Sequence, residues 1–494
     1  MRICVSVTEE TTAAVVDRMA ELLPHADLFE VRADFVRDLD LAALVRARVK
    51  PILLTCRTEK EGGRFPATDE PARRAILAEA VRLGFDLVDV EARAGFDDVA
   101  AAKTGRGLVL SWHDFEGTPQ NLEALYRRMA EAGADIVKIA VTARSIEDLG
   151  RLLAFAQRHA RAREQGRPPL VALAMGPLGV ASRILGGRFG APFTFAAPFA
   201  GREAAPGQLP ARVLAEGYRV RSIGPQTRVY GILGADILRS VSPAIHNRAF
   251  AERGLDAVYV PLQAESMDAF VRALPALGLS GFSVTRPYKP EVLAHLAACE
   301  PEAARAGSVN TVVAREGRLH GSSTDGDGVL VPLRRRADVP GSRIAVVGAG
   351  GAARAAAFAF ERAGAHVTIL ARRRGQAAEA AAATGADHAA LEDIGALRWD
   401  VLVNATPLGS GAYPGRMPVP AEALRPASVV FDMVYEPRET PLLRAARARG
   451  CRTIDGLEML IAQAVGQFQA WTSVPAPEEA MLEAAARALA EATA

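Results

Sequence analysis

Short apolar runs recur along the first two hundred residues, each rich in Val, Ile, Leu or Phe. They span residues 3–7, 28–34, 51–57, 87–92, 108–114, 136–141, 170–175 and 193–198. Runs of this kind are typical of strands that are buried on both faces of a parallel sheet. Stretches with helical spacing of apolar residues, such as 121–132 and 145–160, fill most of the gaps between them.

Strands that alternate with helices eight times predict an α/β fold, a closed parallel (β/α)₈ TIM barrel. Such a barrel commonly forms one domain of about 250 residues. An open, doubly wound sheet is the alternative, but it usually has fewer strands and a glycine-rich turn after the first one. That turn is absent here, so we expect residues 1–222 to form the barrel.

Polar side chains lie near the carboxyl ends of these predicted strands, where such barrels build their active sites. Lys138 lies inside the apolar run 136–141, and burial of an unpaired ammonium costs several kcal/mol. Desolvation lowers the pKa of a lysine and frees its amine to attack a ketone and form a Schiff base. A structural lysine paired with a carboxylate remains the alternative, and His113 alone could be a core histidine.

Six short motifs follow one another in this half: FEVRAD (29–34), CRTEKEGG (56–63), SWHDF (111–115), ADIVKIA (134–140), MGPLGVASR (175–183) and APGQ (205–208). Together they resemble type I 3-dehydroquinate dehydratase over about residues 1–220. The resemblance implies that Lys138 forms an imine with the substrate ketone and that His113 acts as general base and then as general acid. It also implies that Glu61 orients His113 by a hydrogen bond.

The same resemblance implies how the substrate is bound. Arg183 would hold the substrate carboxylate with its two-pronged guanidinium. Contacts to the hydroxyls or the carboxylate would come from Glu30, Arg32, Arg57 and Gln208. The family often has serine where this chain has Ala204, so we expect one hydrogen bond from the lid to be absent.

A Gly/Pro-containing stretch at 222–227 marks the predicted boundary, after which strand-like runs resume at 228–234, 257–263, 281–285 and 308–315. The apolar run from Arg343 then leads into Gly348-x-Gly350-x-x-Ala353 and an alanine-rich helical stretch. In a Rossmann domain these positions give a tight turn, close approach of a pyrophosphate and close helix packing. A turn that serves packing alone is the alternative for such a glycine pattern.

The end of the next predicted strand, in 366–374, indicates which dinucleotide would bind. It carries no Asp or Glu to hold the ribose hydroxyls of NAD but offers Arg372, Arg373 and Arg374, which suit the 2′-phosphate of NADP. A solvated basic helix start is the alternative, above all for Arg374. No Gly-Lys-Ser/Thr follows the glycine turn, which disfavours a nucleoside triphosphate.

Seven further motifs flank this nucleotide unit: SVSPAIHN (240–247), SVTRPYK (283–289), GSVNTV (307–312), GSSTDGDG (321–328), VNATPLG (403–409), DMVYEPRETPLL (432–443) and DGLEMLIAQAVGQFQAW (455–471). The set resembles shikimate dehydrogenase from about residue 228 onward. The resemblance implies that Lys289 and Asp325 form the catalytic pair. It implies that the substrate is bound by Ser240, Ser242, Thr285, Asn310, Tyr435 and Gln463, and the cofactor by Gly348, Ala349, Gly350, Gly351, Ala352, Arg372, Arg373, Thr406 and Met459.

This half departs from the family pattern at three positions, since Ser283, Ser323 and Ala371 stand where asparagine is common. We expect the two serines to loosen supporting hydrogen bonds, and Ala371 to leave more of the ribose contact to Arg372 and Arg373. The predicted domains are a substrate-binding domain at 226–336, completed by helices in 472–494, and a Rossmann domain at 337–471.

Composition narrows the picture further. The formal net charge is +2, so nothing indicates a nucleic-acid surface, and no run approaches the roughly 18 apolar residues of a membrane span. The N-terminal residues lack the pattern of a signal peptide, so we expect a cytoplasmic protein. Four cysteines lie far apart with no Cys-x-x-Cys pair, so we expect neither a metal site nor disulfides.

The two resemblances fit one pathway. Dehydration of 3-dehydroquinate yields 3-dehydroshikimate, which the second half would reduce to shikimate with NADPH, so a fused enzyme with small-molecule substrates is the leading hypothesis. Two alternatives stay open: a metabolite sensor with inactive sites, and a catabolic dehydrogenase that uses quinate and NAD. The sequence leaves open whether the chain forms oligomers and whether the intermediate passes directly between the sites.

Overall fold

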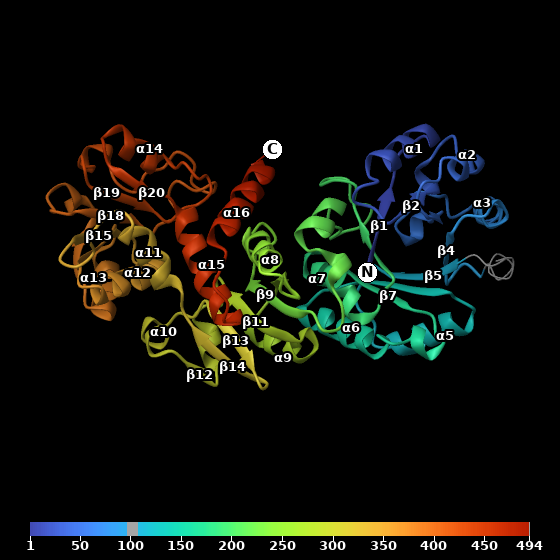
Figure 1. Ribbon diagram of the computed structural model, residues 1–494, viewed down its shortest axis with the longest axis horizontal. Helices are drawn as coiled ribbons and strands as arrows, with labels where there is room; N and C mark the ends of the chain where they lie inside the picture. Colours follow the sequence, from blue (N-terminus) through green and yellow to red (C-terminus); the bar gives the residue numbers. More distant parts are fainter. Residues whose placement is uncertain (96–106, 494) are drawn as a thin grey trace. The chain divides into compact units, whose positions relative to one another are not determined.

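The computed structural model describes residues 1–95 and 107–493 (Figure 1). The chain divides into two compact units. The first comprises Met1–Arg239 and Asp256–Leu279, and the second comprises Ser240–Leu255 and Ser280–Ala494. Residue 494, the last of the predicted segment 472–494, lies outside the described residues.

The first unit contains an eight-stranded parallel barrel, in the strand order β7-β6-β5-β4-β3-β2-β1-β8. Hydrogen bonds join every neighbouring pair in this order, so the barrel is nearly closed, with its seam between β7 and β8. This arrangement confirms the predicted TIM barrel. The strands are β1 (Arg2–Val7), β2 (Leu28–Arg32), β3 (Ile52–Thr55), β4 (Leu87–Glu91), β5 (Gly107–Asp114), β6 (Ile136–Thr142), β7 (Leu170–Met175) and β8 (Phe193–Ala196).

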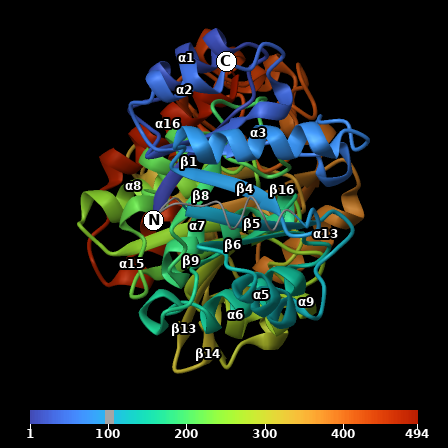
Figure 2. The same cartoon turned by 90° about the vertical axis from the view of Figure 1, so that its right-hand side faces the viewer.

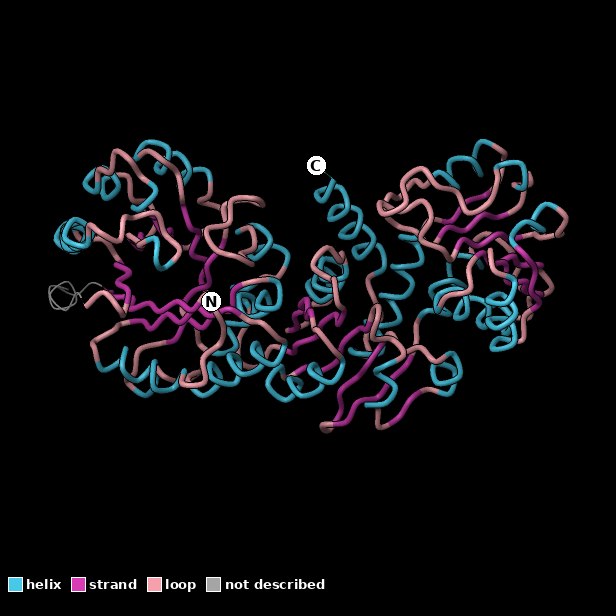
Figure 3. Tube along the Cα trace, turned by 180° about the vertical axis from the view of Figure 1, so that it is seen from behind, coloured by secondary structure: helices cyan, strands magenta, loops and turns pink. Residues whose placement is uncertain are grey.

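Helices cover the outside of the barrel, as the trace coloured by secondary structure shows (Figure 3). They are α1 (Thr12–Glu21), α2 (Leu41–Arg46), α3 (Glu70–Leu83), α5 (Leu122–Glu131), α6 (Ile146–Arg158) and α7 (Val180–Leu185). The sequence sets their starts: Asp69 accepts a hydrogen bond from the backbone of Ala72 before α3, and Ser145 accepts one from Asp148 before α6. Figure 2 shows α3 beside β4 on the outer side of the barrel.

An apolar core supports the polar end of the barrel. It draws buried side chains from most strands: Cys4, Leu28, Leu53, Val109, Ile136, Ala140, Val171, Leu173, Phe193 and Phe195. Because side chains alternate along a strand, Lys138 projects on the same side of β6 as Ile136 and Ala140. The apolar packing therefore fixes the direction in which Lys138 points.

The part of the chain after the barrel begins with two parallel strands in the first unit, β9 (Arg228–Gly234) and β10 (Ala257–Gln263), followed by α9 (Met267–Leu277). The second unit continues with β11 (Leu279–Val284), β12 (Ala298–Cys299), β13 (Thr311–Arg315) and β14 (Arg318–Ser322). The strands β11, β13 and β14 pair antiparallel. The helices of this region are α8 (Ser242–Glu252), α10 (Pro301–Ala306) and α11 (Asp325–Arg334).

A six-stranded parallel sheet with the order β17-β16-β15-β18-β19-β20 completes the second unit. The strand order reverses between β15 and β18, and dinucleotides bind at such a switch point in Rossmann folds. This sheet confirms the predicted Rossmann fold. Its strands are β15 (Arg343–Val347), β16 (His366–Ala371), β17 (Asp387–Ala390), β18 (Val401–Asn404), β19 (Val429–Asp432) and β20 (Arg452–Ile454), and its helices are α12 (Gly351–Arg362), α13 (Arg374–Thr384) and α14 (Pro441–Ala448).

Two helices follow at the end of the chain, α15 (Gly456–Thr472) and α16 (Glu478–Thr493), and both pack against α8. Among the described helices, none has the length and apolar character needed to cross a membrane.

Candidate active sites

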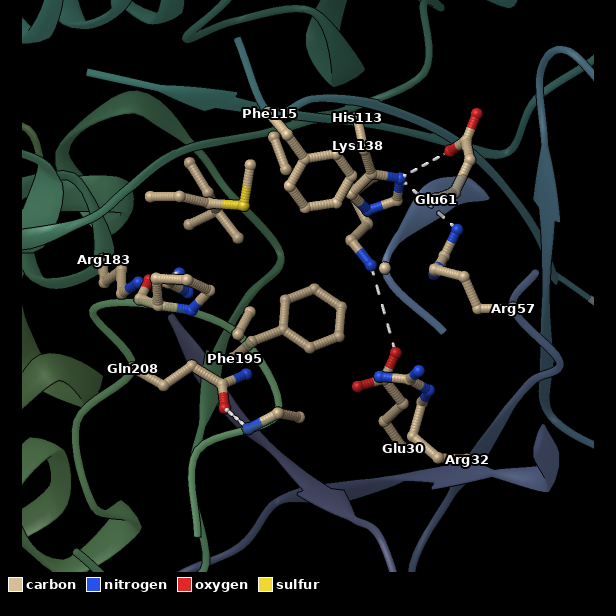
Figure 4. A pocket seen from close by; sticks show the side chains of 17 residues that line it. Glu30, Arg32, Arg57, Glu61, His113, Phe115, Lys138, Arg183, Phe195 and Gln208 are labelled. Carbon is tan, nitrogen blue, oxygen red and sulfur yellow. Dashed lines mark hydrogen bonds and ion pairs between the residues drawn. The ribbon is translucent and has the colours of Figure 1, made fainter. Parts of the chain in front are cut away.

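A cavity of about 220 Å³ opens at the carboxyl ends of the barrel strands (Figure 4). Its lining includes every residue that the sequence predicted for the first site: Glu30, Arg32, Arg57, Glu61, His113, Lys138, Arg183 and Gln208. These residues come from strands and loops that are far apart in the sequence. The barrel therefore brings the predicted set together in one place.

Lys138 reaches this cavity from β6 and is only 6% exposed. Its Nζ lies 3.3 Å from Asp89 Oδ2 and 3.9 Å from Glu30 Oε1. The same nitrogen lies 4.2 Å from the centre of the Phe195 ring. Lys138 is thus both ion-paired, as in the structural alternative, and open to a ligand in the cavity.

His113 lies in the same cavity, held on one side by Glu61. Its Nδ1 is 3.0 Å from Glu61 Oε2 and 3.3 Å from Arg57 Nη1. Burial, with the charges of Arg57 and Lys138 adding to it, brings the pKa of His113 well below its ordinary value. Burial also raises the pKa of Glu61 to about 7, with the neighbouring Glu91 carboxylate adding to the shift. At neutral pH the imidazole is therefore an unprotonated base, and Glu61 lies near its titration midpoint.

Arg57 is held mainly by carboxylates that the sequence analysis did not name. Its Nη2 lies 2.8 Å from Asp89 Oδ1 and its Nη1 lies 3.3 Å from Glu91 Oε1. Ser111 donates a further hydrogen bond to Asp89, at 2.6 Å. Burial opposes the charge of Asp89, but Arg57 and Lys138 outweigh it and keep the pKa of Asp89 below its usual value. The alternation of acidic and apolar residues in β4 is the sequence signal that could have revealed these acids.

Arg183 lies at the opposite side of the cavity, next to the loop after β8. It is 2% exposed; one terminal nitrogen donates to the carbonyl oxygen of Pro206 at 2.9 Å, and its Nε has no hydrogen-bond partner among the described residues. Burial lowers the pKa of Arg183 to about 10, which leaves it a cation at neutral pH. A buried cation with an unsatisfied donor suits a carboxylate ligand.

Gln208 ties this loop to the strands. Its side-chain oxygen accepts a hydrogen bond from the backbone of Ala204 at 2.8 Å, and its Nε2 donates to Ser6 Oγ at 3.3 Å. Ser6 in turn donates to Glu30 at 2.6 Å. The backbone at Ala204 is therefore anchored although its side chain has no hydroxyl.

Arg32 makes a two-pronged ion pair with Asp34, at 2.9 and 2.7 Å.

A second cluster lies in the second unit around Lys289 and Asp325. Lys289 Nζ lies 2.7 and 3.0 Å from the two carboxylate oxygens of Asp325. Asn310 and Gln463 donate to the same carboxylate, at 2.8 and 2.7 Å. Asp325 is 4% exposed, whereas the side chain of Lys289 is 26% exposed, so the ammonium is accessible and its partner is fixed.

The remaining residues predicted for this site are placed by their elements. Ser242 begins α8, and its backbone donates to Ser240 Oγ at 3.2 Å. Thr285 directly follows β11, whose Val284 bonds to the backbone of Asn310. Burial raises the pKa of Tyr435. In the part of the chain that the structure describes, no hydrogen bond joins Ser240, Thr285 or Tyr435 to the carboxylate of Asp325.

The predicted cofactor residues surround the turn between β15 and α12. Gly348 has a φ of +123°, and a Cβ there would lie 3.1 Å from the backbone oxygen of Ala405, so the turn requires glycine. Cβ atoms at Gly350 and Gly351 would meet nothing within 4 Å, and α12 starts without a side-chain cap. Its free backbone donors beside open space fit a pyrophosphate.

The positions around this turn agree with a 2′-phosphorylated nucleotide. Arg372 and Arg373 are exposed at the end of β16 and form no ion pair with any described residue. Thr406 follows β18, and its hydroxyl and backbone both donate to Asn404 Oδ1. Met459, in α15, packs into the apolar core beneath the sheet. The described residues include no cluster of three or more His, Cys, Asp or Glu side chains that could hold a metal.

Both halves of the chain match known protein families. Residues 3–225 match the family described as Type I 3-dehydroquinase. Residues 232–312 match the shikimate dehydrogenase substrate binding domain, and residues 456–486 match the shikimate 5′-dehydrogenase C-terminal domain.

Individual relatives show the same pattern. The chain is 36% identical over 483 residues to a chloroplastic bifunctional 3-dehydroquinate dehydratase/shikimate dehydrogenase of Arabidopsis thaliana. The match covers 92% of this chain and 79% of that relative. A shikimate dehydrogenase (NADP(+)) of Thermococcus kodakarensis is 41% identical over 53% of this chain and 96% of its own length. The crystal structure of a shikimate 5-dehydrogenase of Thermus thermophilus with NADP(H) and shikimate is 36% identical, with a TM-score of 0.50 over 53% of this chain and 99% of that one. The chain therefore belongs to the family of bifunctional 3-dehydroquinate dehydratase/shikimate dehydrogenases.

Proposed function

We propose that this chain catalyses two consecutive steps of the shikimate pathway. The barrel dehydrates 3-dehydroquinate to 3-dehydroshikimate through a Schiff base, and the second half reduces 3-dehydroshikimate to shikimate with NADPH. The observation that carries the proposal is the convergence of a buried lysine and a neutral histidine on one cavity in the barrel, Lys138 and His113. The second half adds an accessible lysine paired with a fixed carboxylate.

In the barrel, Lys138 attacks the ketone of the substrate and forms the iminium. The iminium withdraws electrons and makes the neighbouring C–H bond acidic. His113 takes that proton as base and returns it to the departing hydroxyl, which leaves as water. Glu61 accepts the hydrogen bond from Nδ1 and leaves Nε2 free for the substrate. Arg183 binds the substrate carboxylate.

In the second half, Lys289 donates a proton to the carbonyl oxygen of 3-dehydroshikimate during reduction. Asp325 holds the ammonium in place and, with Asn310 and Gln463, contacts the hydroxyls of the ring. Ser240 and Ser242 bind the carboxylate as neutral donors. NADPH supplies the hydride when bound, with its pyrophosphate at Gly348–Ala352 and its 2′-phosphate at Arg372 and Arg373.

We also propose the domain bounds, the partners and the cellular location of the protein. The domains are a barrel at 1–222, a substrate-binding domain at 226–336 with 472–494, and a Rossmann domain at 337–471. The partners are the small-molecule substrates, without nucleic acid or membrane, and the location is cytoplasmic, which fractionation of the source cells would test.

A coupled assay tests the whole proposal. The purified chain receives 3-dehydroquinate and NADPH, and NADPH consumption is followed by absorbance; we expect steady oxidation that depends on both compounds. The same assay with NADH is expected to be much slower, and the reverse reaction is expected to prefer shikimate with NADP over quinate with NAD. No turnover in any arm would favour the metabolite sensor, and faster turnover with quinate and NAD would favour the catabolic dehydrogenase.

Two variants separate the halves. Lys138→Ala is expected to abolish dehydration and to leave NADP-linked oxidation of shikimate unchanged, because the nucleophile is lost only in the barrel. Lys289→Ala is expected to do the reverse. Retained dehydration in Lys138→Ala would refute the assigned nucleophile, and a loss of both activities in either variant would show that the halves do not act independently.

A further inference from the structure

Asp89 is the carboxylate nearest to the amine of Lys138, and no role in the proposed reaction has been given to it. Asp89 Oδ2 lies 3.3 Å from Lys138 Nζ, and Asp89 is only 2% exposed. The strand register accounts for the contact, because β4, β5 and β6 are neighbours and place Asp89, Ser111 and Lys138 toward the same interior. The contact is therefore built into the barrel.

The other contacts of Asp89 fix its position. Its Oδ1 accepts hydrogen bonds from Arg57 Nη2 at 2.8 Å and from Ser111 Oγ at 2.6 Å. These donors leave Oδ2 directed at Lys138. Glu30 is the next carboxylate, at 3.9 Å, but it already accepts hydrogen bonds from Ser6 and Thr55.

The charges around Lys138 come from every neighbouring element of the cavity. Carboxylates are supplied by β2, β4 and the segment after β3, and cations by Arg32, Arg57 and Arg183. The neutral imidazole of His113 and the Phe195 ring complete the surroundings. The charged and titratable groups are Cys4, Glu30, Arg32, Arg57, Glu61, Asp89, Glu91, His113 and Arg183. Among these described groups, Asp89 alone lies within hydrogen-bond distance of Lys138 Nζ.

We propose that Asp89 is a positioning residue that holds Lys138 Nζ at the substrate carbonyl and then stays beside it as the counter-ion of the iminium. The proposal deepens the proposed dehydratase function and rests on it. In the condensation, the ammonium and the ketone give the iminium and one water: the C–N bonds form, the C–O bonds break, and two protons of the ammonium leave with the oxygen. The nitrogen is cationic before and after, so one fixed anion stabilises both states.

Asp89→Asn tests this role because it keeps the shape and removes the charge. We expect the dehydratase kcat to fall by roughly tenfold to a hundredfold, the size of one lost charge-assisted contact. Borohydride trapping with substrate, followed by mass analysis of the Lys138 peptide, is expected to give less adduct. In a pH profile of the trapping rate, we expect the acidic limb to move to lower pH, because the ammonium of Lys138 loses the neighbouring anion. A merely structural role of Asp89 would not move this limb.

Ser111→Ala is the matched control, since it removes the hydrogen bond that Ser111 donates to Asp89 and keeps the carboxylate. We expect a smaller fall in kcat and no displacement of the acid limb. Shikimate oxidation by the same samples reports whether the chain has folded. An acid limb that stays in place in Asp89→Asn, or one that moves equally in both variants, would overturn the role of Asp89. No adduct on Lys138 in the unmodified chain would instead overturn the proposed function.

Discussion

At the scale of single residues, the pairing of His113 with Glu61 makes the dehydratase sensitive to pH. Burial raises the pKa of Glu61 to about 7 and lowers that of His113 well below its ordinary value. As pH falls through about 7, Glu61 therefore gains a proton before His113 does. A protonated Glu61 no longer stabilises the imidazolium that forms when His113 takes the substrate proton.

We therefore expect dehydratase kcat to decline as pH falls through about 7, and Glu61→Gln to lose this limb. The variant should also be slower at every pH, by roughly tenfold to a hundredfold, because Gln accepts the hydrogen bond without supplying charge. The measurement is a pH–rate profile of both proteins, with shikimate oxidation as the internal control. A limb near pH 7 that persists in Glu61→Gln would assign the titration to another group.

At the scale of elements, the loop after β8 depends on one glycine. Gly207 has a φ of +78°, and a Cβ there would lie 2.7 Å from the backbone oxygen of Gly176. Gly201, in the same loop, has the same φ of +78° but meets nothing within 4 Å. Substitution of either glycine by alanine costs about 1 kcal/mol in backbone strain, but only Gly207→Ala also forces the loop away from Gly176, the residue that follows β7.

We expect Gly207→Ala to raise the KM for 3-dehydroquinate about tenfold, because the loop carries Gln208 and the carbonyl of Pro206 that contacts Arg183. Gly201→Ala should change KM less than twofold. Steady-state kinetics of the two variants decide the matter. Equal effects would show that strain, and not the contact with Gly176, controls the loop.

The sequence predicted the helices and strands better than it predicted the side-chain contacts between them. Apolar runs located all eight barrel strands, because strands buried on both faces carry a continuous signal. The run 308–315 was predicted as a strand throughout, but β13 begins only at Thr311. Asn310, just before it, donates its side-chain amide to Thr324 and Asp325. The acidic–apolar alternation in β4 signals an acid at Asp89, but it does not show what that acid contacts. The contacts among Asp89, Ser111 and Lys138 depend on the register between neighbouring strands, which no single segment encodes.

At the scale of the whole molecule, the first compact unit extends beyond the predicted boundary at 222–227. It includes β9, β10 and α9, and α9 packs along the barrel helix α6. A Cβ at Gly150 of α6 would lie 3.3 Å from Cβ of Ala273 in α9, so small residues allow the two helices to approach closely. Arg272 adds a two-pronged ion pair with Glu147, at 2.8 and 3.0 Å.

The close packing of Gly150 against Ala273 and the ion pair between Arg272 and Glu147 differ in strength, and hydrogen exchange can measure the difference. The side chains of Arg272 and Glu147 are 59% and 41% exposed, and exposed ion pairs contribute about 0–1 kcal/mol, so Arg272→Ala should leave α9 in place. Gly150→Leu inserts a side chain where even one carbon is tight, and overpacking costs about 1–3 kcal/mol. We expect faster amide hydrogen exchange in 267–277 for Gly150→Leu alone. Exchange that quickens only in Arg272→Ala would mean that charge, and not close packing, holds α9 against the barrel.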